Sequence, residues 1–264
     1  MDLSQYEFEK KQEIFNCETH GEMQIEVWRT GRNDDYRGRE CPKCKSKKEE
    51  RQKLEEQERQ NQVMKRVREI NIKKFNENSG IALRYTDKDL INYITKTEQE
   101  MKALKVCNDY VNNFEDHLIK GRCLIFCGNA GTGKTHLACA IVSEVINTYA
   151  KQAVYTTIGK IFRAVKSTYS KSSTKSEEEV LLEFTRPSLL VIDEIGVQYG
   201  SDTEKNILFE VVNDRYEKLK PTIIISNLSL SSLTEFAGER VVDRLKENGG
   251  KLIIFDWKSN RGAS

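Results

Sequence analysis

Five short apolar runs, separated by stretches of helical character, constrain the fold of this chain more than any other feature of its sequence. The apolar runs lie at residues 123–127, 153–156, 189–192, 222–225 and 252–255, and the helical stretches at 135–150, 159–169 and 203–219. A strand that is apolar along its whole length is buried on both faces, as in a parallel sheet with helices on two sides. The sequence therefore predicts an α/β fold of three layers around a central parallel sheet.

The length and the overall charge limit the remaining possibilities. At about 150 residues per domain, a chain of 264 residues predicts one large domain with a small appendage. Lys and Arg number 43 and Asp and Glu 41, so the net charge of +2 excludes a uniformly basic nucleic-acid coat. Residues 1–7 lack the features of a secretory signal, and no run approaches the roughly 18 apolar residues of a membrane span. We therefore expect a cytoplasmic protein without a membrane partner.

A glycine-rich loop follows the first apolar run. It consists of Gly128, Asn129, Ala130, Gly131, Thr132, Gly133, Lys134 and Thr135, which fits the phosphate-loop pattern of Gly, four residues and Gly-Lys-Thr. In such a loop the backbone N–H groups face the phosphates, the lysine binds the β- and γ-phosphates, and the threonine hydroxyl binds Mg²⁺. A strand before the loop and a helix after it are the context that the pattern requires. The sequence thus predicts ATP and Mg²⁺ as ligands.

An acidic pair ends the third apolar run. Asp193 and Glu194 directly follow Ile192, and the carboxyl end of a strand is where open α/β sheets bind ligands. We expect Asp193 to hold Mg²⁺ through water and Glu194 to orient and deprotonate the water that attacks the γ-phosphate. Alone, such a pair is usually a solvated strand end. On a sheet that also carries a phosphate loop, it indicates ATP hydrolysis.

Polar and basic residues later in the chain complete the predicted site. Asn227 follows the run 222–225, where it either lies between the γ-phosphate and the attacking water or simply ends the strand in a turn. Arg240 and Arg244 are four residues apart and share a helical face, and Arg261 follows them. We expect Arg244 to be an arginine finger that acts on the nucleotide of a neighbouring subunit. The alternative for either arginine is a surface ion pair with a neighbouring acid.

Four potential metal ligands lie near the N-terminus. Cys17 and His20 form a Cys-x₂-His pair, and Cys41 and Cys44 form a Cys-x₂-Cys pair 20 residues further on. Two such knuckles supply four ligands for tetrahedral Zn²⁺ with no open position, which indicates a structural zinc. A short segment with little apolar content needs a cross-link of this kind, here a bound metal, to maintain a stable fold. We interpret the other cysteines as buried, inert thiols: Cys107, Cys123, Cys127 and Cys139.

A charged connector occupies residues 49–78. The stretch from 45 to 74 has 11 basic and 6 acidic residues, a local charge of +5, and contains neither Gly nor Pro. Val63, Val67 and Ile70 recur at helical spacing, so we expect a solvated helix whose C-terminal half packs on another part of the protein.

Taken together, these motifs resemble the AAA+ ATPase family and, more narrowly, the DnaC-type replicative helicase loaders. The resemblance rests on the phosphate loop and on five further segments: 79–81, 83–85, 189–198, 238–245 and 254–261. It implies the first sensor at Asn227, the trans-acting finger at Arg244 and, at Arg261, the second sensor that reads the nucleotide in cis. The resemblance also implies a domain order. Residues 1–48 form a zinc-binding region that interacts with the helicase, 49–78 the helical connector, and 79–264 a P-loop AAA+ ATPase domain without a C-terminal helical lid.

A basic helix is the predicted DNA contact. Lys160, Arg163 and Lys166 recur every three residues, with Phe162 and Tyr169 nearby, where helicase loaders and DnaA-like initiators carry an extra helix that lines the ATPase spiral. Cations that follow phosphates, with aromatic rings for stacking, suit single-stranded DNA. The alternative is a basic, solvated helix face.

The resemblance implies an ATPase that assembles as an ATP-dependent spiral oligomer and places a replicative hexameric DNA helicase on single-stranded DNA during replication initiation. A lone subunit should hydrolyse ATP slowly. The connector helix either binds the helicase through its apolar stripe or holds the zinc region away from the ATPase core. Two alternative functions remain: a transposase-helper ATPase of the IstB type, and a DNA-binding adaptor in which the nucleotide is only a structural ligand. The presence of Lys134, Thr135, Asp193 and Glu194 speaks against the adaptor.

Overall fold

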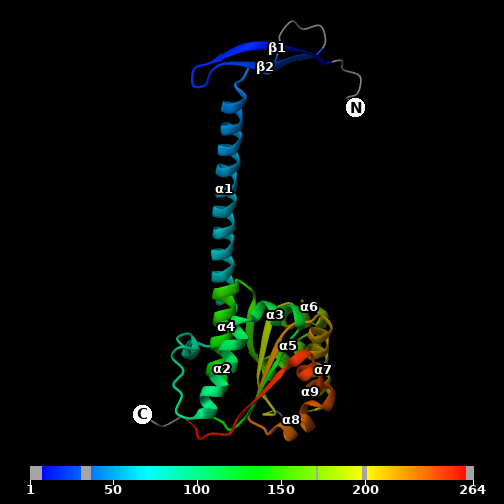
Figure 1. The fold of residues 1–264 in the computed structure, drawn as a ribbon. Helices are drawn as coiled ribbons and strands as arrows, with labels where there is room; N and C mark the ends of the chain where they lie inside the picture. Colours follow the sequence, from blue (N-terminus) through cyan, green and yellow to red (C-terminus); the bar gives the residue numbers. More distant parts are fainter. Residues whose placement is uncertain (1–7, 31–36, 171, 198–200, 260–264) are drawn as a thin grey trace. The chain divides into compact units, whose positions relative to one another are not determined.

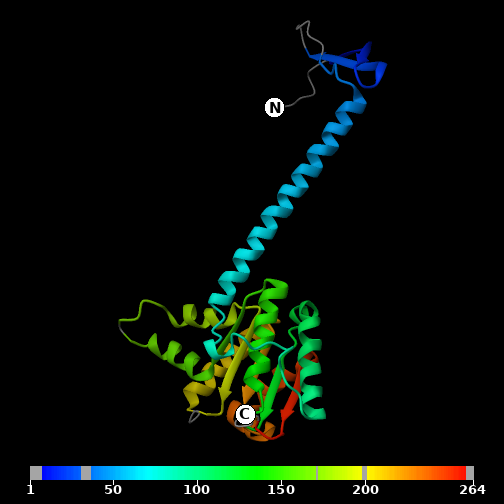
Figure 2. The ribbon, with the colours of Figure 1, turned by 90° about the vertical axis from the view of Figure 1, so that its left-hand side faces the viewer.

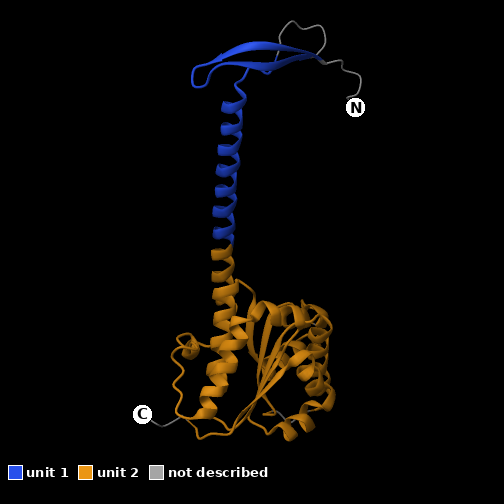
Figure 3. Ribbon diagram, in the orientation of Figure 1, with its two compact units in different colours: residues 1–67 blue, residues 68–264 orange. Residues whose placement is uncertain are grey.

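The computed structural model describes residues 8–30, 37–170, 172–197 and 201–259 (Figure 1). The chain divides into two compact units, residues 1–67 and 68–264, and the division falls within one long helix, α1 (Pro42–Glu77) (Figure 3). This helix begins before the predicted connector, so Cys44 lies in its first turn. Among the described residues, no helix has the length and apolar character that crossing a membrane requires.

The first unit contains an antiparallel hairpin that the sequence did not predict. Strands β1 (Phe8–Cys17) and β2 (Gly21–Thr30) pair in a register that sets Cys17 opposite Gly21. The buried side chains of Ile25 and Val27, two residues apart on one face of β2, supply its small apolar core. Charged and polar residues together fill most other positions of both strands, and they obscure the alternation that would reveal a hairpin.

The second unit is built on a five-stranded parallel sheet, as predicted. Its strands lie in the order β4-β5-β6-β3-β7. Their bounds are β3 (Leu124–Gly128), β4 (Ala153–Thr157), β5 (Leu189–Ile195), β6 (Thr222–Ser226) and β7 (Lys251–Phe255). In this order β3 lies between β6 and β7, so the carboxyl ends of β3, β5 and β6 share one edge of the sheet.

Helices cover both faces of the sheet (Figures 1 and 2). One face carries α2 (Glu98–Asn112), α3 (Phe114–Lys120) and α4 (Lys134–Tyr149). The other carries α5 (Ile158–Ser167), α6 (Glu177–Thr185), α7 (Asp202–Glu217), α8 (Leu230–Ala237) and α9 (Glu239–Lys246). Short 3-10 turns lie at Leu83–Tyr85 and Glu247–Gly249. Alternate strand residues feed two separate cores: Leu189 and Val191 pack toward α4, and Leu190 and Ile192 toward α5 and α7. The structure therefore confirms the three-layer α/β fold.

Local sequence signals place the helix starts. Thr97 and Ser176 each begin a capping box, in which the hydroxyl accepts from the third backbone N–H and a glutamate at that position reaches back. The predicted helical stretches correspond to α4, α5 and α7 within one or two residues at most ends.

The prediction for α1 was right in part: the helix is solvated and its C-terminal end packs on the core, but the apolar stripe does not supply that contact. Val63, Val67 and Ile70 are all exposed, and no described residue of α1 is fully buried. Contact with the core comes instead from Ile72 and Phe75, in the last turns of the helix. Helical periodicity identifies a face but not the partner that covers it.

Candidate nucleotide-binding site and metal centre

The phosphate-loop residues lie between β3 and α4, and Lys134 is the first residue of the helix. Thr132 is fully buried, and its hydroxyl donates to the carbonyl oxygen of Asn129 at 2.8 Å. The ammonium group of Lys134 donates to the carbonyl oxygens of Gly128 and Asn129 at 2.8 and 2.6 Å. The loop opens a helix of 16 residues, so its free backbone N–H groups and the helix dipole both favour an anion.

Two aromatic side chains hold the loop from outside. The hydroxyl of Tyr93 and the indole N–H of Trp257 each donate to the carbonyl oxygen of Thr132 at 3.1 Å. Gly133 has φ of 95°, and a Cβ there would lie 2.6 Å from the Tyr93 ring. The loop therefore needs glycine at this position for two reasons, backbone conformation and space. Sequence reasoning did not give Tyr93 or Trp257 any role at the site.

The acidic pair lies beside the loop. Asp193 is buried, and its Oδ2 atom accepts a hydrogen bond from the hydroxyl of Thr135 at 2.8 Å. Thus the structure brings together the two side chains expected to hold Mg²⁺, across 58 residues of sequence. A carboxylate beside a hydroxyl supplies the hard oxygen ligands that Mg²⁺ prefers.

Glu194 is exposed and occupies a different environment from Asp193. Its φ is 63°, in the left-handed region, and the pairing of β5 with β6 shifts register between Ile192 and Ile195. Because of this bulge, Glu194 does not follow the alternating in-and-out pattern of the strand, and it lines the cavity in front of the loop. Asn227, which follows β6, is exposed and lines the same cavity.

That cavity has a volume of about 780 Å³, which is in the range of small-molecule and cofactor sites. The loop and the acidic pair form one side. The other side comes from the segment between α1 and α2, with these lining residues: Arg84, Tyr85, Lys88, Asn92, Tyr93, Ile94 and Lys96. In the sequence, this segment shows only the family resemblance at 83–85, because it lacks a periodic pattern.

Tyr155 is a further residue that sequence reasoning missed. It lies on β4, and its hydroxyl donates to Oδ2 of Asp193 at 2.8 Å. Burial raises the pKa of Tyr155, and the nearby Asp193 charge raises it further, so the hydroxyl keeps its proton and acts as a donor. In the sequence, the only signal is a tyrosine within an apolar strand.

Arg240 and Arg244 are the predicted arginines within the described residues, and neither lines this cavity. Arg240 is exposed on α9. Arg244 is half-buried, and its guanidinium carbon lies 4.7 Å from the ring centroid of Phe209 and 5.5 Å from that of Tyr216. Within the described part of the chain, neither arginine forms the ion pair that was the alternative interpretation. Arg261 lies outside the described residues.

Of the predicted DNA-contacting side chains, Lys160, Arg163 and Lys166 lie on α5 and Tyr169 follows the helix, and their surroundings differ. Lys160 and Arg163 are exposed. Lys166 forms an ion pair with Glu204 at 2.9 Å, and the Tyr169 hydroxyl donates to Glu177 at 3.3 Å. Phe162, also on α5, is buried, contrary to the expectation that it is available for stacking. It lies on the apolar face that joins α5 to the core.

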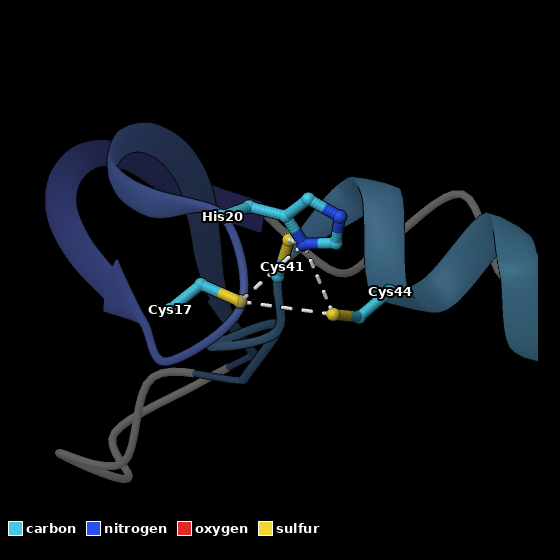
Figure 4. Close-up of side chains that lie close together, drawn as sticks. All are labelled: Cys17, His20, Cys41 and Cys44. Carbon is cyan, nitrogen blue, oxygen red and sulfur yellow. Dashed lines mark hydrogen bonds between the residues drawn. The ribbon is translucent and has the colours of Figure 1, made fainter.

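The four N-terminal metal ligands converge in the first unit (Figure 4). Cys17 ends β1, His20 lies in the hairpin turn, and Cys41 and Cys44 lie at the start of α1. The Nδ1 atom of His20 lies 3.6, 3.5 and 3.4 Å from the sulfur atoms of Cys17, Cys41 and Cys44, and the sulfurs of Cys17 and Cys44 are 3.6 Å apart.

These distances fit a tetrahedral zinc. Zn–S and Zn–N bonds of about 2.3 and 2.0 Å separate the ligand atoms by about 3.5 to 3.8 Å. All four ligand atoms lie within 4.8 Å of one another, and the set of three sulfurs and one imidazole is typical of closed structural sites. The other cysteines are buried within the second unit, and burial raises the pKa of Cys127 to about 11 and of Cys139 to about 12. Such thiols are poor nucleophiles and poor metal ligands.

Comparison with known proteins agrees with this architecture. The IstB-like ATP binding protein family matches residues 46–245. The replicative helicase loader DnaC of Escherichia coli K12 is 37% identical over 204 residues, which covers 77% of this chain and 79% of that protein. A crystal structure of the DnaC helicase loader superimposes with a TM-score of 0.59 at 28% identity and covers 66% of this chain and 100% of that one.

A crystal structure of DnaI has the same fold, with a TM-score of 0.56 at 18% identity over 69% of this chain and 94% of that one. The fold of the second unit is thus the P-loop AAA+ fold. With its phosphate loop, acidic pair and match over 200 residues, the chain belongs to the IstB-like ATP-binding family, and within that family it is a relative of the DnaC-type helicase loaders.

Proposed function

We propose that this protein uses ATP to load a replicative hexameric DNA helicase onto single-stranded DNA during replication initiation. One observation carries the proposal more than any other. The hydroxyl of Thr135 and the carboxylate of Asp193 meet at 2.8 Å, in the lining of a cavity of about 780 Å³, in a chain 37% identical to a helicase loader.

The residues around the cavity support ATP hydrolysis. The loop N–H groups and Lys134 bind the phosphates, and Thr135 and Asp193 hold Mg²⁺, which neutralises phosphate charge when bound. Glu194, freed from the strand by the bulge, accepts a proton from the attacking water. Asn227 reaches the same cavity and orients that water. Arg261, which lies outside the described residues, is proposed to read the nucleotide in cis.

The arginine of α9 is proposed to act between subunits. Arg244 supplies positive charge to the γ-phosphate bound by a neighbour, a contribution worth about 10³ to 10⁵ in rate for such fingers. Since Arg244 does not line the cavity of its own subunit, a lone subunit lacks this charge and turns over slowly. Arg240, exposed on the same helix, is the alternative finger.

The two other functional surfaces are the metal centre and α5. A zinc held by Cys17, His20, Cys41 and Cys44 stabilises the hairpin unit, through which the protein grips the helicase. The exposed Lys160 and Arg163 of α5, with Lys166 and Tyr169 beside them, follow the phosphates of single-stranded DNA inside an ATP-dependent spiral of subunits.

Capture of the helicase tests the proposal. The tagged protein is incubated with the replicative helicase of its source organism, with and without ATP and single-stranded DNA. We expect capture that is strongest with ATP, and we expect Glu194→Gln, which binds ATP without turnover, to retain the helicase longest. Absence of capture in every condition would overturn the proposal.

The same capture experiment distinguishes the proposed function from two alternatives. An IstB-type transposase helper shares the family but serves an integrase-like partner, so it would not retain the helicase. A DNA-binding adaptor would retain a partner without any ATP turnover, even with DNA present. The identity to helicase loaders over 77% of the chain favours the first proposal over both.

A further inference from the structure

Tyr155 on the edge strand β4 contacts the carboxylate that is proposed to hold Mg²⁺. Its hydroxyl and that of Thr135 both donate to Oδ2 of Asp193, each at 2.8 Å. The other oxygen, Oδ1, accepts the backbone N–H of Glu194 at 2.6 Å. Three donors from three elements therefore fix both the position and the rotation of the Asp193 carboxylate.

Tyr155 supplies a hydrogen-bond donor to Asp193 that is not part of the phosphate-loop pattern. The hydroxyl of Thr135 can offer a lone pair to Mg²⁺ while its proton faces Asp193, so that bond belongs to the pattern. Tyr155 is buried, and its hydroxyl contacts the site through the hydrogen bond that it donates to Asp193, which orients that carboxylate. Its role is therefore to position another residue.

The backbone of Tyr155 is attached to the end of α1. Its N–H donates to the carbonyl oxygen of Ser79 at 2.7 Å. Gly80 has φ of 73°, and a Cβ there would lie 2.2 Å from the carbonyl oxygen of Tyr155. Segment 79–80 thus covers the open edge of the sheet at the residue that orients Asp193.

The last turns of α1 also contact the helix of the phosphate loop. Arg68 donates to the carbonyl oxygen of Thr148, near the C-terminal end of α4, and Asn76 donates to the side-chain oxygen of Asn147 at 2.9 Å. Residues 68–80 therefore touch α4, which carries Thr135, and β4, which carries Tyr155. These are the two elements that present hydroxyl donors to Asp193.

We propose that Tyr155 is a positioning residue for the Mg²⁺ site, and that its backbone contact makes the orientation of Asp193 depend on the seating of segment 79–80 after α1. The inference rests on the proposed ATP function and deepens it. Tyr155 links the end of α1 to the proposed nucleotide site, because its backbone N–H contacts Ser79 and its hydroxyl contacts Asp193.

The first test replaces Tyr155 with phenylalanine, which keeps the ring and removes the donor. Binding of a fluorescent, non-hydrolysable ATP analogue is measured by anisotropy across a Mg²⁺ titration. We expect the half-saturating Mg²⁺ concentration to rise about tenfold, in keeping with one lost hydrogen bond to a charged group. Affinity in EDTA should not change, because Tyr155 does not touch the phosphate loop in any of the contacts above.

Tyr149→Phe is the matched control. The Tyr149 hydroxyl donates to the carbonyl oxygen of Val111 at 2.7 Å, within the same unit and away from Asp193. Both variants lose one tyrosine hydroxyl, so thermal unfolding should respond similarly while only Tyr155→Phe changes the Mg²⁺ dependence. A merely structural role for Tyr155 would move the unfolding temperature and leave the Mg²⁺ dependence unchanged.

A second variant tests the link to α1. Gly80→Ala forces segment 79–80 away from β4, and we expect it to raise the half-saturating Mg²⁺ concentration in the same direction. Combined with Tyr155→Phe it should add little, because both changes act through Asp193. Full additivity in the double variant, or an unchanged Mg²⁺ dependence in a folded Gly80→Ala protein, would overturn the link.

The outcomes separate this inference from the function on which it rests. If the unaltered protein shows no Mg²⁺-dependent nucleotide binding, the ATP function fails. If it shows such binding and Tyr155→Phe matches both the unaltered protein and Tyr149→Phe, only the positioning role of Tyr155 is overturned.

Discussion

At the residue scale, catalysis is expected to depend on a break in strand geometry. Asp193 keeps the alternation of β5 and faces α4, whereas Glu194 has φ of 63° and faces the cavity. A side chain at positive φ costs about 1 to 2 kcal/mol, and the surrounding contacts must hold it there. Neighbouring carboxylates thus receive different environments, as two different roles require.

The strain at Glu194 gives a paired prediction. Glu194→Gln and Glu194→Gly should both lower the ATPase rate by about 10² or more, because each removes the base. In urea denaturation, Glu194→Gly should be more stable than Glu194→Gln by about 1 kcal/mol, because glycine adopts positive φ without strain. Equal stability of the two variants would show that the bulge stores no strain, and retained hydrolysis would remove Glu194 from its role.

Functional residues could be predicted from the sequence where the interacting groups form a local motif, and could not where they are far apart in the sequence. The phosphate loop and Asp193 carry local patterns, so the sequence reveals them. Trp257 reaches Thr132 across 125 residues, and no local pattern marks such a contact. Arg215 is fully buried and donates to Thr222 and to the carbonyl oxygens of Phe184 and Pro221, whereas sequence alone places an arginine at the surface.

At the element scale, the apolar strands and the helices that separate them were predictable because burial on two faces leaves a continuous signal. The hairpin of the first unit was not predictable in this way. Its buried core is little more than Ile25, Val27 and the thiols of the candidate metal centre, so the contacts among those four ligand groups, rather than strand propensity, are expected to define it. The same limit explains α1, whose stripe at 63–70 is visible in the sequence but exposed in the structure.

A metal prediction belongs at this scale. The purified protein should hold one zinc per chain, measured by atomic absorption. Removal by a chelator should abolish amide-exchange protection across β1 and β2, because so small a core cannot hold the hairpin alone. Nucleotide affinity should persist, since the cavity is formed within residues 68–264.

Two cysteine variants complete the zinc experiment. Cys41→Ser removes a ligand and should lose the zinc, whereas Cys107→Ser alters a fully buried thiol of α2 and should keep it. Zinc bound equally by both variants would place the metal elsewhere, and a hairpin that stays protected without metal would remove its structural role.

At the scale of the whole molecule, the two units carry separable chemistry. Residues 1–67 hold the candidate zinc centre, and residues 68–264 hold the nucleotide cavity. The match to helicase loaders covers 77% of the chain. The proposed loading function requires partner binding to depend on the nucleotide state, and the contacts of Ser79 and Gly80 with Tyr155 connect the end of α1 to the residue that orients Asp193.

Helicase loading on circular single-stranded DNA tests the central claim most directly, because a closed circle offers no end onto which a ring can thread. Helicase retained on such circles is measured after gel filtration, with this protein and ATP present or absent. We expect retention at least tenfold above that of helicase alone, and its loss with Lys134→Ala, which removes the ammonium group proposed to bind phosphate. Retention that is the same with and without this protein would overturn the proposed loading function.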